Sequence, residues 1–224
     1  MKVLITGGAG FIAHHVIDHI LKTTDWHITT LDRLDESGNL NRLHDILKEH
    51  SQETRKRHRT VFHDLKAALN SQIRADIGDI DIVLHLAAGS HVDRSITHPM
   101  EFVQDNVIGT VNLLNWAKGL PNLKKFVYFS TDEIFGVAPP GVSYQEYDRY
   151  NSTNPYSASK AAAEEFCVAY ENTYKMPIYI THTMNVFGQR QHPEKFIPGT
   201  IQRVRDGDKV TIHADSSKTK AGSR

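Results

Sequence analysis

The stretch Thr6-Gly7-Gly8-Ala9-Gly10-Phe11-Ile12-Ala13 decides the fold class of this chain. It follows an apolar run, Val3–Thr6, and opens a segment of helical period, Phe11–Leu21. It fits G-x-x-G-x-x-A from Gly7 and G-x-G-x-x-A from Gly8. Glycines permit the tight turn and let backbone N–H groups approach a pyrophosphate, and the helix amino end adds about half a positive charge. The strand–turn–helix context predicts a dinucleotide-binding turn.

The rest of the chain continues this alternation of short apolar runs and helical segments. Such alternation predicts crossover units, and therefore an α/β fold: a Rossmann-like doubly wound parallel sheet with helices on both faces. Asn154 and Pro155 are suited to open the last helix as its N-cap and first residue. The polar segment His50–Arg59 is interpreted as a solvated turn. Strands are expected at Val3–Thr6, Ile28–Leu31, Val61–Phe62, Ile82–Leu86, Phe126–Phe129 and Ile178–Thr181, and helices at Phe11–Leu21, Leu40–Lys48, Pro99–Lys118 and Pro155–Tyr174.

Composition excludes several classes of partner. Among 224 residues, Lys+Arg and Asp+Glu both total 26, so no net charge favours nucleic acid or an anionic membrane. No stretch approaches the roughly 20 apolar residues of a membrane helix, and the first residues are too short an apolar run for a secretory signal. The single Cys167 excludes an internal disulfide, as in a reducing compartment. We therefore expect a soluble, cytoplasmic protein.

Fourteen histidines raise the question of a metal site. His15 and His19 share a face of the first expected helix, beside His14, but no His-Glu-x-x-His arrangement or thiol cluster accompanies them. Solvated helix histidines are the favoured interpretation, and no metal is expected.

An acidic residue at the end of the second strand indicates which dinucleotide binds. Asp32 lies about 20 residues after the glycines, where a carboxylate accepts a hydrogen bond from a ribose 2′-hydroxyl and repels a 2′-phosphate. This position favours NAD over NADP, although the adjacent Arg33 is able to stack or to pair with a phosphate. Asp64, just past the third strand, has two interpretations, an adenine contact or the N-cap of a following helix.

Two clusters carry the chemistry. Tyr156 and Lys160 stand at i, i+4, so both side chains leave one helix face. The lysine and an oxidised nicotinamide both favour tyrosinate, which would remove a hydroxyl proton while hydride leaves the same carbon. Thr131 follows the fifth apolar run and is placed to hold that hydroxyl. Asp132 and Glu133 exceed the needs of simple oxidation. Two carboxyls here have two interpretations: a base for proton abstraction next to a new ketone with an acid for a departing hydroxyl, or an exposed turn with a helix cap.

On these segments the chain resembles the extended short-chain dehydrogenase/reductases, and within them the nucleotide-sugar 4,6-dehydratases of the dTDP-glucose type. STDE with YSASK is specific to this part of the family, since related epimerases and decarboxylases tend to lack the Asp of that tetrapeptide. The matching segments are TGGAGFIA (6–13), LDRL (31–34), HLAAGSHVDRSI (85–96), NVIGT (106–110), STDEIFG (130–136), NPYSASKAAAEE (154–165) and QHPEKFIP (191–198).

The resemblance implies a role for each matching residue. Tyr156 is the base for oxidation at C4 of the sugar, and Lys160 also binds the nicotinamide ribose. Asp132 protonates the departing C6 hydroxyl, and Glu133 takes the C5 proton. The implied NAD-binding residues are Gly7, Gly10, Phe11, Ile12, Asp32, Arg33, Asp64, Leu65, Leu86, Ala87, Ala88, Tyr156 and Lys160; the implied nucleotide-sugar contacts are Ser90, Thr131, Asn185, Lys195 and Arg224.

The chain also departs from the family pattern. Ala13 replaces the usual third glycine, and Gly89 stands where these dehydratases usually carry Glu. Family members continue for roughly another hundred residues, within the usual size of a domain. Here a plausible strand at Val210–Ile212 is followed by a loop-like end. We therefore expect residues 1–224 to form an NAD-binding Rossmann domain that carries the catalytic residues and lacks all or part of the C-terminal sugar-nucleotide lobe.

The favoured activity is a nucleotide-sugar 4,6-dehydratase that uses bound NAD. A C4-epimerase or a UDP-glucuronate decarboxylase of the same fold is the nearest alternative, and a non-catalytic NAD-binding fragment is another. The resemblance further implies a homodimer, in which the helices at Pro99–Lys118 and Pro155–Tyr174 pair as a four-helix bundle.

Overall fold

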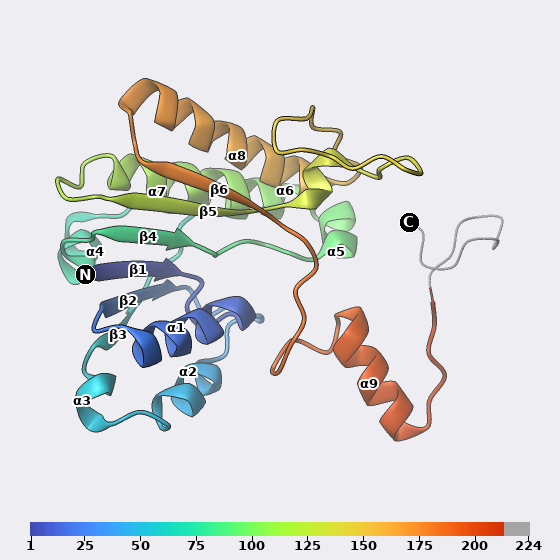
Figure 1. Ribbon diagram of the computed structural model, residues 1–224, viewed down its shortest axis with the longest axis horizontal. Coiled ribbons are helices and arrows are strands. Elements are labelled where there is room, and N and C mark those ends of the chain that lie inside the picture. The colour runs from blue at the N-terminus through green and yellow to red at the C-terminus, as the bar shows by residue number, and fades with distance from the viewer. Residues whose placement is uncertain (213–224) are drawn as a thin grey trace. The chain divides into compact units, whose positions relative to one another are not determined.

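The computed structural model describes residues 1–212, and the chain divides into two compact units, residues 1–185 and 186–224. In the first unit, six strands form one sheet in the order β3-β2-β1-β4-β5-β6 (Figure 1). All neighbouring strands pair in parallel, so their carboxyl ends lie at one edge. The order reverses between β1 and β4, which is where folds of this type bind ligands. The strands are β1 Lys2–Thr6, β2 His27–Asp32, β3 His58–Phe62, β4 Ile82–His85, β5 Lys125–Thr131 and β6 Ile178–Thr183.

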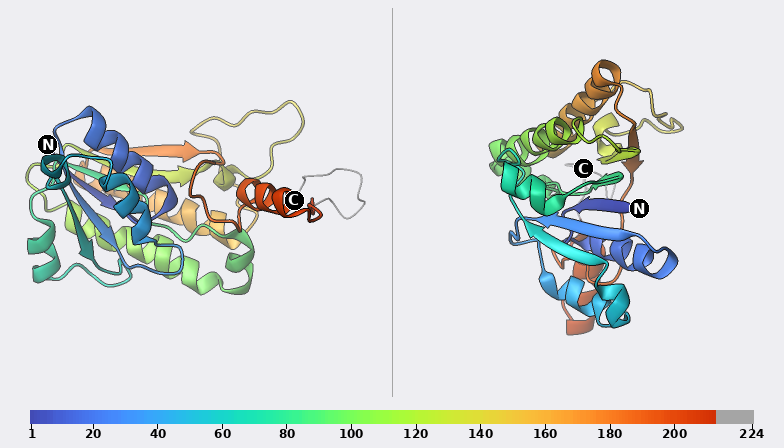
Figure 2. Two further views of the ribbon diagram at one scale, coloured as in Figure 1. Left: turned by 90° about the horizontal axis from the view of Figure 1, so that it is seen from below. Right: turned by 90° about the vertical axis from the view of Figure 1, so that its left-hand side faces the viewer.

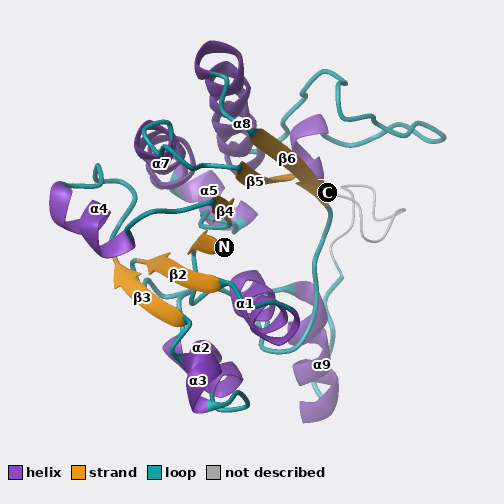
Figure 3. Ribbon diagram, turned by 60° about the vertical axis from the view of Figure 1, so that its left-hand side comes forward, coloured by secondary structure: helices purple, strands orange, loops and turns teal. Residues whose placement is uncertain are grey.

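Helices cover both faces of this sheet (Figures 2 and 3). Successive side chains of a strand point to opposite faces, so Val3 and Ile5 of β1 belong to one buried cluster and Leu4 belongs to the other. The cluster around Leu4 is completed by α4, α7 and α8, and the cluster around Val3 by α1 and α2. The predicted doubly wound α/β fold is confirmed. The helices of this unit are α1 Phe11–Thr23, α2 Leu40–Leu47, α3 Gln52–Arg55, α4 Ser71–Ile77, α5 Val92–Thr97, α6 Pro99–Phe102, η1 Val103–Ile108, α7 Gly109–Ala117, η2 Asp132–Phe135 and α8 Pro155–Tyr174.

Helix α8 has the bounds that the sequence predicts. The Asn154 side chain accepts a hydrogen bond from the Ser157 N–H at 2.8 Å, and the Ser157 hydroxyl is reached by the Asn154 N–H, which forms a capping box. Pro155 occupies the first turn, where its missing N–H costs nothing. Lys175 ends the helix in the left-handed conformation, with φ +55°. These local signals position Tyr156 and Lys160.

The expected helix Pro99–Lys118 is interrupted. Residues 103–108 form a π-helix, η1, between α6 and α7. The extra residue per turn changes which side chains face inward, and such turns occur frequently at functional sites. Just after it, the Thr110 hydroxyl donates to the carbonyl of Asn106 at 2.5 Å.

Three further expectations are wrong. The segment His50–Arg59, expected as a solvated turn, contains α3 and the first two residues of β3, because pairing with β2 extends that strand beyond its apolar core. His14 is fully buried rather than solvated, since α1 turns it toward the protein, and its Nδ1 lies 3.2 Å from the Gly10 carbonyl. Residues Val210–Ile212 form no strand.

The second unit, within the residues that the structure describes, contains helix α9, Phe196–Asp206. Lys195 precedes it as the N-cap, and Gly207 ends it with φ +79°. Arg224, an implied nucleotide-sugar contact, lies outside the described residues. No helix within residues 1–212 is long and apolar enough to cross a membrane.

Truncation of Phe126 in the middle of β5 will destabilise the fold. Its side chain is fully buried, so Phe126→Ala is expected to lower the free energy of unfolding by about 3–5 kcal/mol. Phe62→Ala removes the same atoms from a side chain that is 54% exposed, and we expect it to cost less than about 1 kcal/mol. Urea unfolding of both variants measures the difference; equal losses would contradict the placement of Phe126 in the core.

Candidate active site

The glycine turn lies in close contact with the segment that follows β4. Gly7 has φ +70°, and a Cβ atom on it would lie 3.0 Å from the Ala87 Cα. A Cβ on Gly8 would lie 2.4 Å from the Thr30 Cβ, and one on Gly10 would lie 2.9 Å from the Gly7 carbonyl oxygen. The turn therefore has room for backbone only. The N–H groups of Gly7 and Gly10 donate to the carbonyls of Leu31 and Gly7, at 2.8 and 2.9 Å, and keep the turn tight. The amino end of α1 follows directly, and its dipole favours a bound anion. These residues fit the pyrophosphate of a dinucleotide.

The Gly7 geometry gives a test with a matched control. Gly7→Ala is expected to weaken NAD binding about ten- to hundredfold, because relief of the contact with Ala87 displaces the amino end of α1, whose hydrogen bonds to an anion are worth about 1.5–3 kcal/mol. Gly141 has φ +78°, but a Cβ atom on it would meet nothing within 4 Å among the described residues, so Gly141→Ala carries only the backbone cost. Calorimetric titration with NAD compares the two; equal affinities would contradict this assignment.

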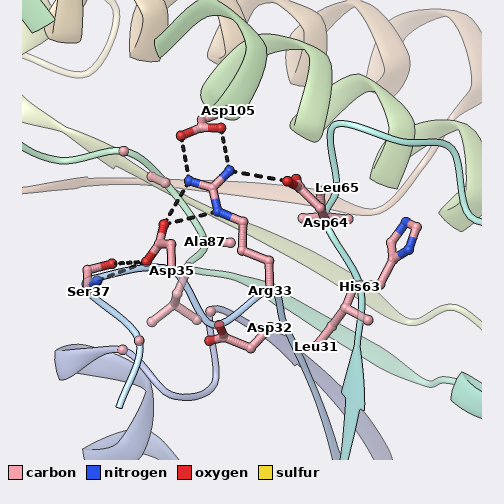
Figure 4. A pocket seen from close by; sticks show the side chains of 16 residues that line it. Leu31, Asp32, Arg33, Asp35, Ser37, His63, Asp64, Leu65, Ala87 and Asp105 are labelled. Atoms are coloured by element: carbon pink, nitrogen blue, oxygen red, sulfur yellow. Dashed lines mark hydrogen bonds and ion pairs between the residues drawn. The ribbon is translucent and has the colours of Figure 1, made fainter. Parts of the chain in front are cut away.

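A pocket extends from the glycine turn along the carboxyl ends of β2 and β4 (Figure 4). It brings together most of the residues that the sequence assigns to the cofactor, while Phe11, Ile12, Tyr156 and Lys160 are not among its lining residues. Lining residues that the sequence did not assign to the cofactor are Leu31, Asp35, Ser37, Gly38, His63, Gly89 and Asp105; the assigned ones are Gly7, Gly10, Asp32, Arg33, Asp64, Leu65, Leu86, Ala87 and Ala88.

The acidic residues of this pocket are fixed by backbone hydrogen bonds. The Asp32 carboxylate accepts from the N–H groups of Ala9 at 2.9 Å and Leu34 at 2.8 Å, which ties it to the glycine turn. Asp64 accepts from the Lys66 N–H at 2.9 Å within a turn, and no helix begins there. The N-cap interpretation of Asp64 is therefore wrong, because the next helix, α4, begins at Ser71.

Tyr156 and Lys160 lie on the first turns of α8. The Tyr156 N–H donates to the Ser95 hydroxyl at 3.1 Å, and its phenol makes a hydrogen bond with Thr131. Lys160 is buried; its ammonium donates to the Phe129 carbonyl at 2.6 Å and lies 4.2 Å from the centre of the Tyr128 ring. The end of β5 thus holds both side chains.

The three polar residues at the end of β5 form a connected group. The Thr131 hydroxyl accepts from the Glu133 N–H at 3.3 Å and so caps η2, and it donates to the Asp132 carboxylate at 3.3 Å. The Glu133 carboxylate accepts from the Asn154 side-chain amide at 3.3 Å. Since Asn154 also caps α8, this bond connects the carboxylate pair to the helix that carries Tyr156.

Without a dinucleotide, the pKa of the candidate base, Tyr156, lies above its ordinary value. Burial raises the pKa of Tyr156 to about 12, with added repulsion from Glu133 and Asp132, against the opposing hydrogen bond with Thr131. Burial also lowers the pKa of Lys160 to about 8, although Cys167 and Glu164 oppose this shift. The groups that shift the pKa of Tyr156 here are the two carboxylates and Thr131, while the Lys160 ammonium donates to the Phe129 carbonyl. That Lys160 favours tyrosinate stays a prediction.

A spectroscopic titration tests the raised pKa of Tyr156. Without a dinucleotide, Tyr156 is expected to stay protonated until pH about 12, because burial disfavours the phenolate. Oxidised NAD carries a positive nicotinamide, so its binding is expected to lower the pKa of Tyr156. NADH lacks this charge, and its binding is not expected to lower the pKa. The difference in phenolate absorbance between the chain and Tyr156→Phe measures it. A pKa of Tyr156 below 10 without a dinucleotide would contradict the effect of burial.

Buried His85 organises a network that sequence reasoning missed. Thr6 accepts a hydrogen bond from the Ala87 N–H at 3.1 Å, and its hydroxyl also lies 2.7 Å from His85 Nδ1. The Thr110 hydroxyl donates to the Asn106 carbonyl, so it accepts from His85 Nε2 at 2.9 Å. Burial and Lys160 lower the pKa of His85 to about 3, which keeps the ring neutral.

Asn106 extends this network to the catalytic helix. Its side chain accepts from the Gly89 N–H at 2.7 Å and donates to the Gly89 carbonyl at 3.1 Å and to the Ser159 hydroxyl at 2.8 Å. Ser159 in turn donates to the Tyr156 carbonyl at 2.7 Å. The loop after β4 and helix α8 are therefore held together. His85 and Gly89 lie in the segment HLAAGSH, and Asn106 and Thr110 lie in NVIGT. Only the fold brings the two segments into contact.

The implied sugar contacts are less closely gathered. Thr131 is buried at the end of β5 and pairs in register with Thr183 of β6, two residues before exposed Asn185. Ser90 is exposed in the segment after β4. Lys195 belongs to the second unit.

Within residues 1–212, no three His, Cys, Asp or Glu side chains are grouped to hold a metal ion.

The chain belongs to a known family: residues 3–220 match the NAD dependent epimerase/dehydratase family. It is 38% identical to the dTDP-D-glucose 4,6-dehydratase of Dictyostelium discoideum, with 98% of this chain and 51% of that protein covered. The mouse dTDP-D-glucose 4,6-dehydratase is 39% identical, with 95% of this chain and 58% of that protein covered.

Solved structures show the same relationship. The dTDP-glucose 4,6-dehydratase of Streptomyces venezuelae with NAD bound superposes with a TM-score of 0.85 at 34% identity, over 96% of this chain and 65% of that one. The UDP-glucuronic acid 4-epimerase of Bacillus cereus in complex with NAD gives 0.81 at 29% identity, over 96% and 66%. The chain thus spans between about half and two thirds of the length of these relatives.

Proposed function

We propose that this chain carries the NAD-binding and catalytic part of a nucleotide-sugar 4,6-dehydratase. Its substrate is an NDP-hexose, with dTDP-glucose as the first candidate, and its product is the 4-keto-6-deoxy sugar. The proposal rests on the placement of two carboxylates beside the candidate base: Glu133 and Asp132 lie close enough to raise the pKa of Tyr156. We also propose that the part of the relatives' length that this chain does not span adds contacts to the nucleotide, and that the residues of this chain are sufficient for turnover.

In this proposal NAD is held by the glycine turn, with Asp32 at the ribose and Leu86–Ala88 beside the nicotinamide half. When bound there, NAD would supply hydride transfer from C4 of the sugar and back to C6. Lys160, whose ammonium donates to the Phe129 carbonyl and lies over the Tyr128 ring, would hold the nicotinamide ribose. The turn, the acid and the pocket lining support this assignment.

The chain's own residues move three protons in the proposed reaction. Tyr156 removes the C4 hydroxyl proton, while Thr131 hydrogen-bonds to that hydroxyl. Glu133 takes the C5 proton, which the new C4 ketone has made acidic, and Asp132 gives its proton to the C6 hydroxyl as it leaves as water. Glu133 then returns a proton to C5, which completes the 4-keto-6-deoxy sugar.

A C4-epimerase is the alternative that the comparisons bring closest, since epimerases share the fold. An epimerase oxidises and reduces C4 and needs no acid for a departing hydroxyl. Asp132, hydrogen-bonded to Thr131 within the same turn as Glu133, favours the dehydratase.

Incubation of this chain with NAD and dTDP-glucose in deuterated water tests the proposal. The product is expected to carry deuterium at C5, because Glu133 exchanges its proton with solvent before returning it. An epimerised sugar without deuterium at C5 would support the alternative. Binding of NAD with an unchanged sugar would leave a non-catalytic NAD-binding chain and overturn the proposal.

We further propose a homodimer formed through α6, η1, α7 and α8 as a four-helix bundle. Large apolar side chains exposed on these helices support it: Met100, Val103, Ile108 and Phe166. Sedimentation velocity measures the association state directly.

We also propose a reducing, cytoplasmic location, which the free, buried Cys167 supports.

A further inference from the structure

Arg33 stands where a dinucleotide pocket selects its ligand. It follows Asp32 directly, at the carboxyl end of β2, and lines the pocket. An arginine near the ribose acid is the residue that accommodates the 2′-phosphate of NADP in folds of this type. Its five N–H donors match a phosphate well. By position alone, Arg33 opposes the preference for NAD that Asp32 creates.

The structure shows this guanidinium bound to carboxylates on two sides (Figure 4). Nη1 and Nη2 donate to the two carboxylate oxygens of Asp105, at 2.6 and 2.8 Å. Nε and Nη2 donate to one oxygen of Asp35, at 3.0 and 2.7 Å. Asp64 lies 3.6 Å from Nη1. Each of the three guanidinium nitrogens therefore already has a carboxylate partner.

Both carboxylate partners are themselves held in place. Asp35 accepts from the Ser37 N–H at 3.0 Å and from its hydroxyl at 2.6 Å. Asp105 lies in η1 with its side chain 14% exposed, so its position is set by a helix and not by a free loop. The hydrogen bonds with Asp105 raise the pKa of Arg33 above its already high value.

The remaining charges of the pocket are also mostly negative. Asp32 and Asp64 add two carboxylates to those of Asp35 and Asp105. Lys66 is paired with this group, at 3.4 Å from Asp64 and 3.8 Å from Asp105. A phosphate that entered here would have to displace carboxylates from both cations.

We propose that Asp105 and Asp35 determine the choice of dinucleotide by holding Arg33 away from a 2′-phosphate. The pocket then accepts a ribose with a free 2′-hydroxyl, although it contains the arginine that a phosphate would need. This inference rests on the proposed binding of NAD and adds two residues to its specificity.

The test compares the dissociation constants of NAD and NADP for the chain and for Asp35→Asn/Asp105→Asn, by calorimetry. The NAD-over-NADP preference is expected to fall at least about tenfold in the double variant, since the released guanidinium gains a charge-assisted hydrogen bond to phosphate. When Arg33→Gln is added to the double variant, its gain in relative affinity for NADP is expected to disappear. Asp25→Asn, an exposed carboxylate before the amino end of β2, controls for the loss of charge alone.

Each outcome decides a separate point. An unchanged preference in a folded double variant overturns the inference while NAD binding stands. A gain that persists without Arg33, or that Asp25→Asn reproduces, also overturns it, because net charge then explains the effect. If thermal unfolding shows that the double variant does not fold, Asp105→Asn alone is measured against the same expectation. An unmodified chain that binds neither dinucleotide overturns the proposed function itself.

Discussion

Tyr156→Phe is expected to reduce turnover of the nucleotide-sugar by about a hundred- to ten-thousandfold, which is the usual contribution of a positioned general base. The substitution removes only the hydroxyl that bonds with Thr131, and the ring keeps its edge-to-face contact with Phe102, with centres 6.4 Å apart. NAD affinity and unfolding temperature are therefore expected to stay close to those of the unmodified chain. Product formation and calorimetry measure the two quantities separately.

The comparison variant is Tyr128→Phe. Its hydroxyl is also buried, bonds to the Lys160 carbonyl at 3.4 Å and lies away from the carboxylate pair. We expect this variant to lose far less activity than Tyr156→Phe. Equal losses from both substitutions would contradict the assignment of Tyr156 as the base, since any buried hydroxyl near Lys160 would then account for the effect.

Asp132→Asn is expected to slow the loss of water by about a hundredfold or more while oxidation at C4 continues. Asn keeps the shape of the side chain and its contact with Thr131 but has no proton for the departing hydroxyl. Because hydride is then removed faster than it is returned, reduced cofactor is expected to accumulate, and its near-ultraviolet absorbance reports this. Tyr156→Phe blocks the first step and gives no such signal.

The result that would contradict this role is specific. If Asp132→Asn forms product at an unchanged rate, Asp132 is not the acid. If it loses activity without any accumulation of reduced cofactor, the residue is needed before elimination, and the assignment of separate roles to Asp132 and Glu133 is wrong.

The sequence predicted what local signals determine. The glycine turn lies between a strand and a helix because Gly7 accepts a positive φ, and helix α8 begins and ends where its caps are. The six strands were found because a sheet buried on both faces needs apolar runs. Their ends were underestimated where polar residues continue the pairing, as in Ser130 and Thr131 of β5.

The remaining features depend on contacts between distant residues. The bonds of Arg33 with Asp105 join positions 72 residues apart, and those of His85 with Thr6 join positions 79 apart. Spacing placed Tyr156 and Lys160 on one helix face, but the direction of the ammonium is set by the Phe129 carbonyl of a different element. Sequence periodicity reports none of these, so the pKa values and the charge pairing of the pocket required the fold.

Mass spectrometry of nucleotide-sugars incubated with this chain and NAD determines whether the chain removes water from a sugar. A panel of dTDP-glucose, UDP-glucose and GDP-mannose covers the nucleotide and the sugar. We expect a product lighter by one water from one of these substrates, and the substrate that reacts identifies the nucleotide. Unchanged masses throughout, with NAD bound, would contradict the dehydratase assignment.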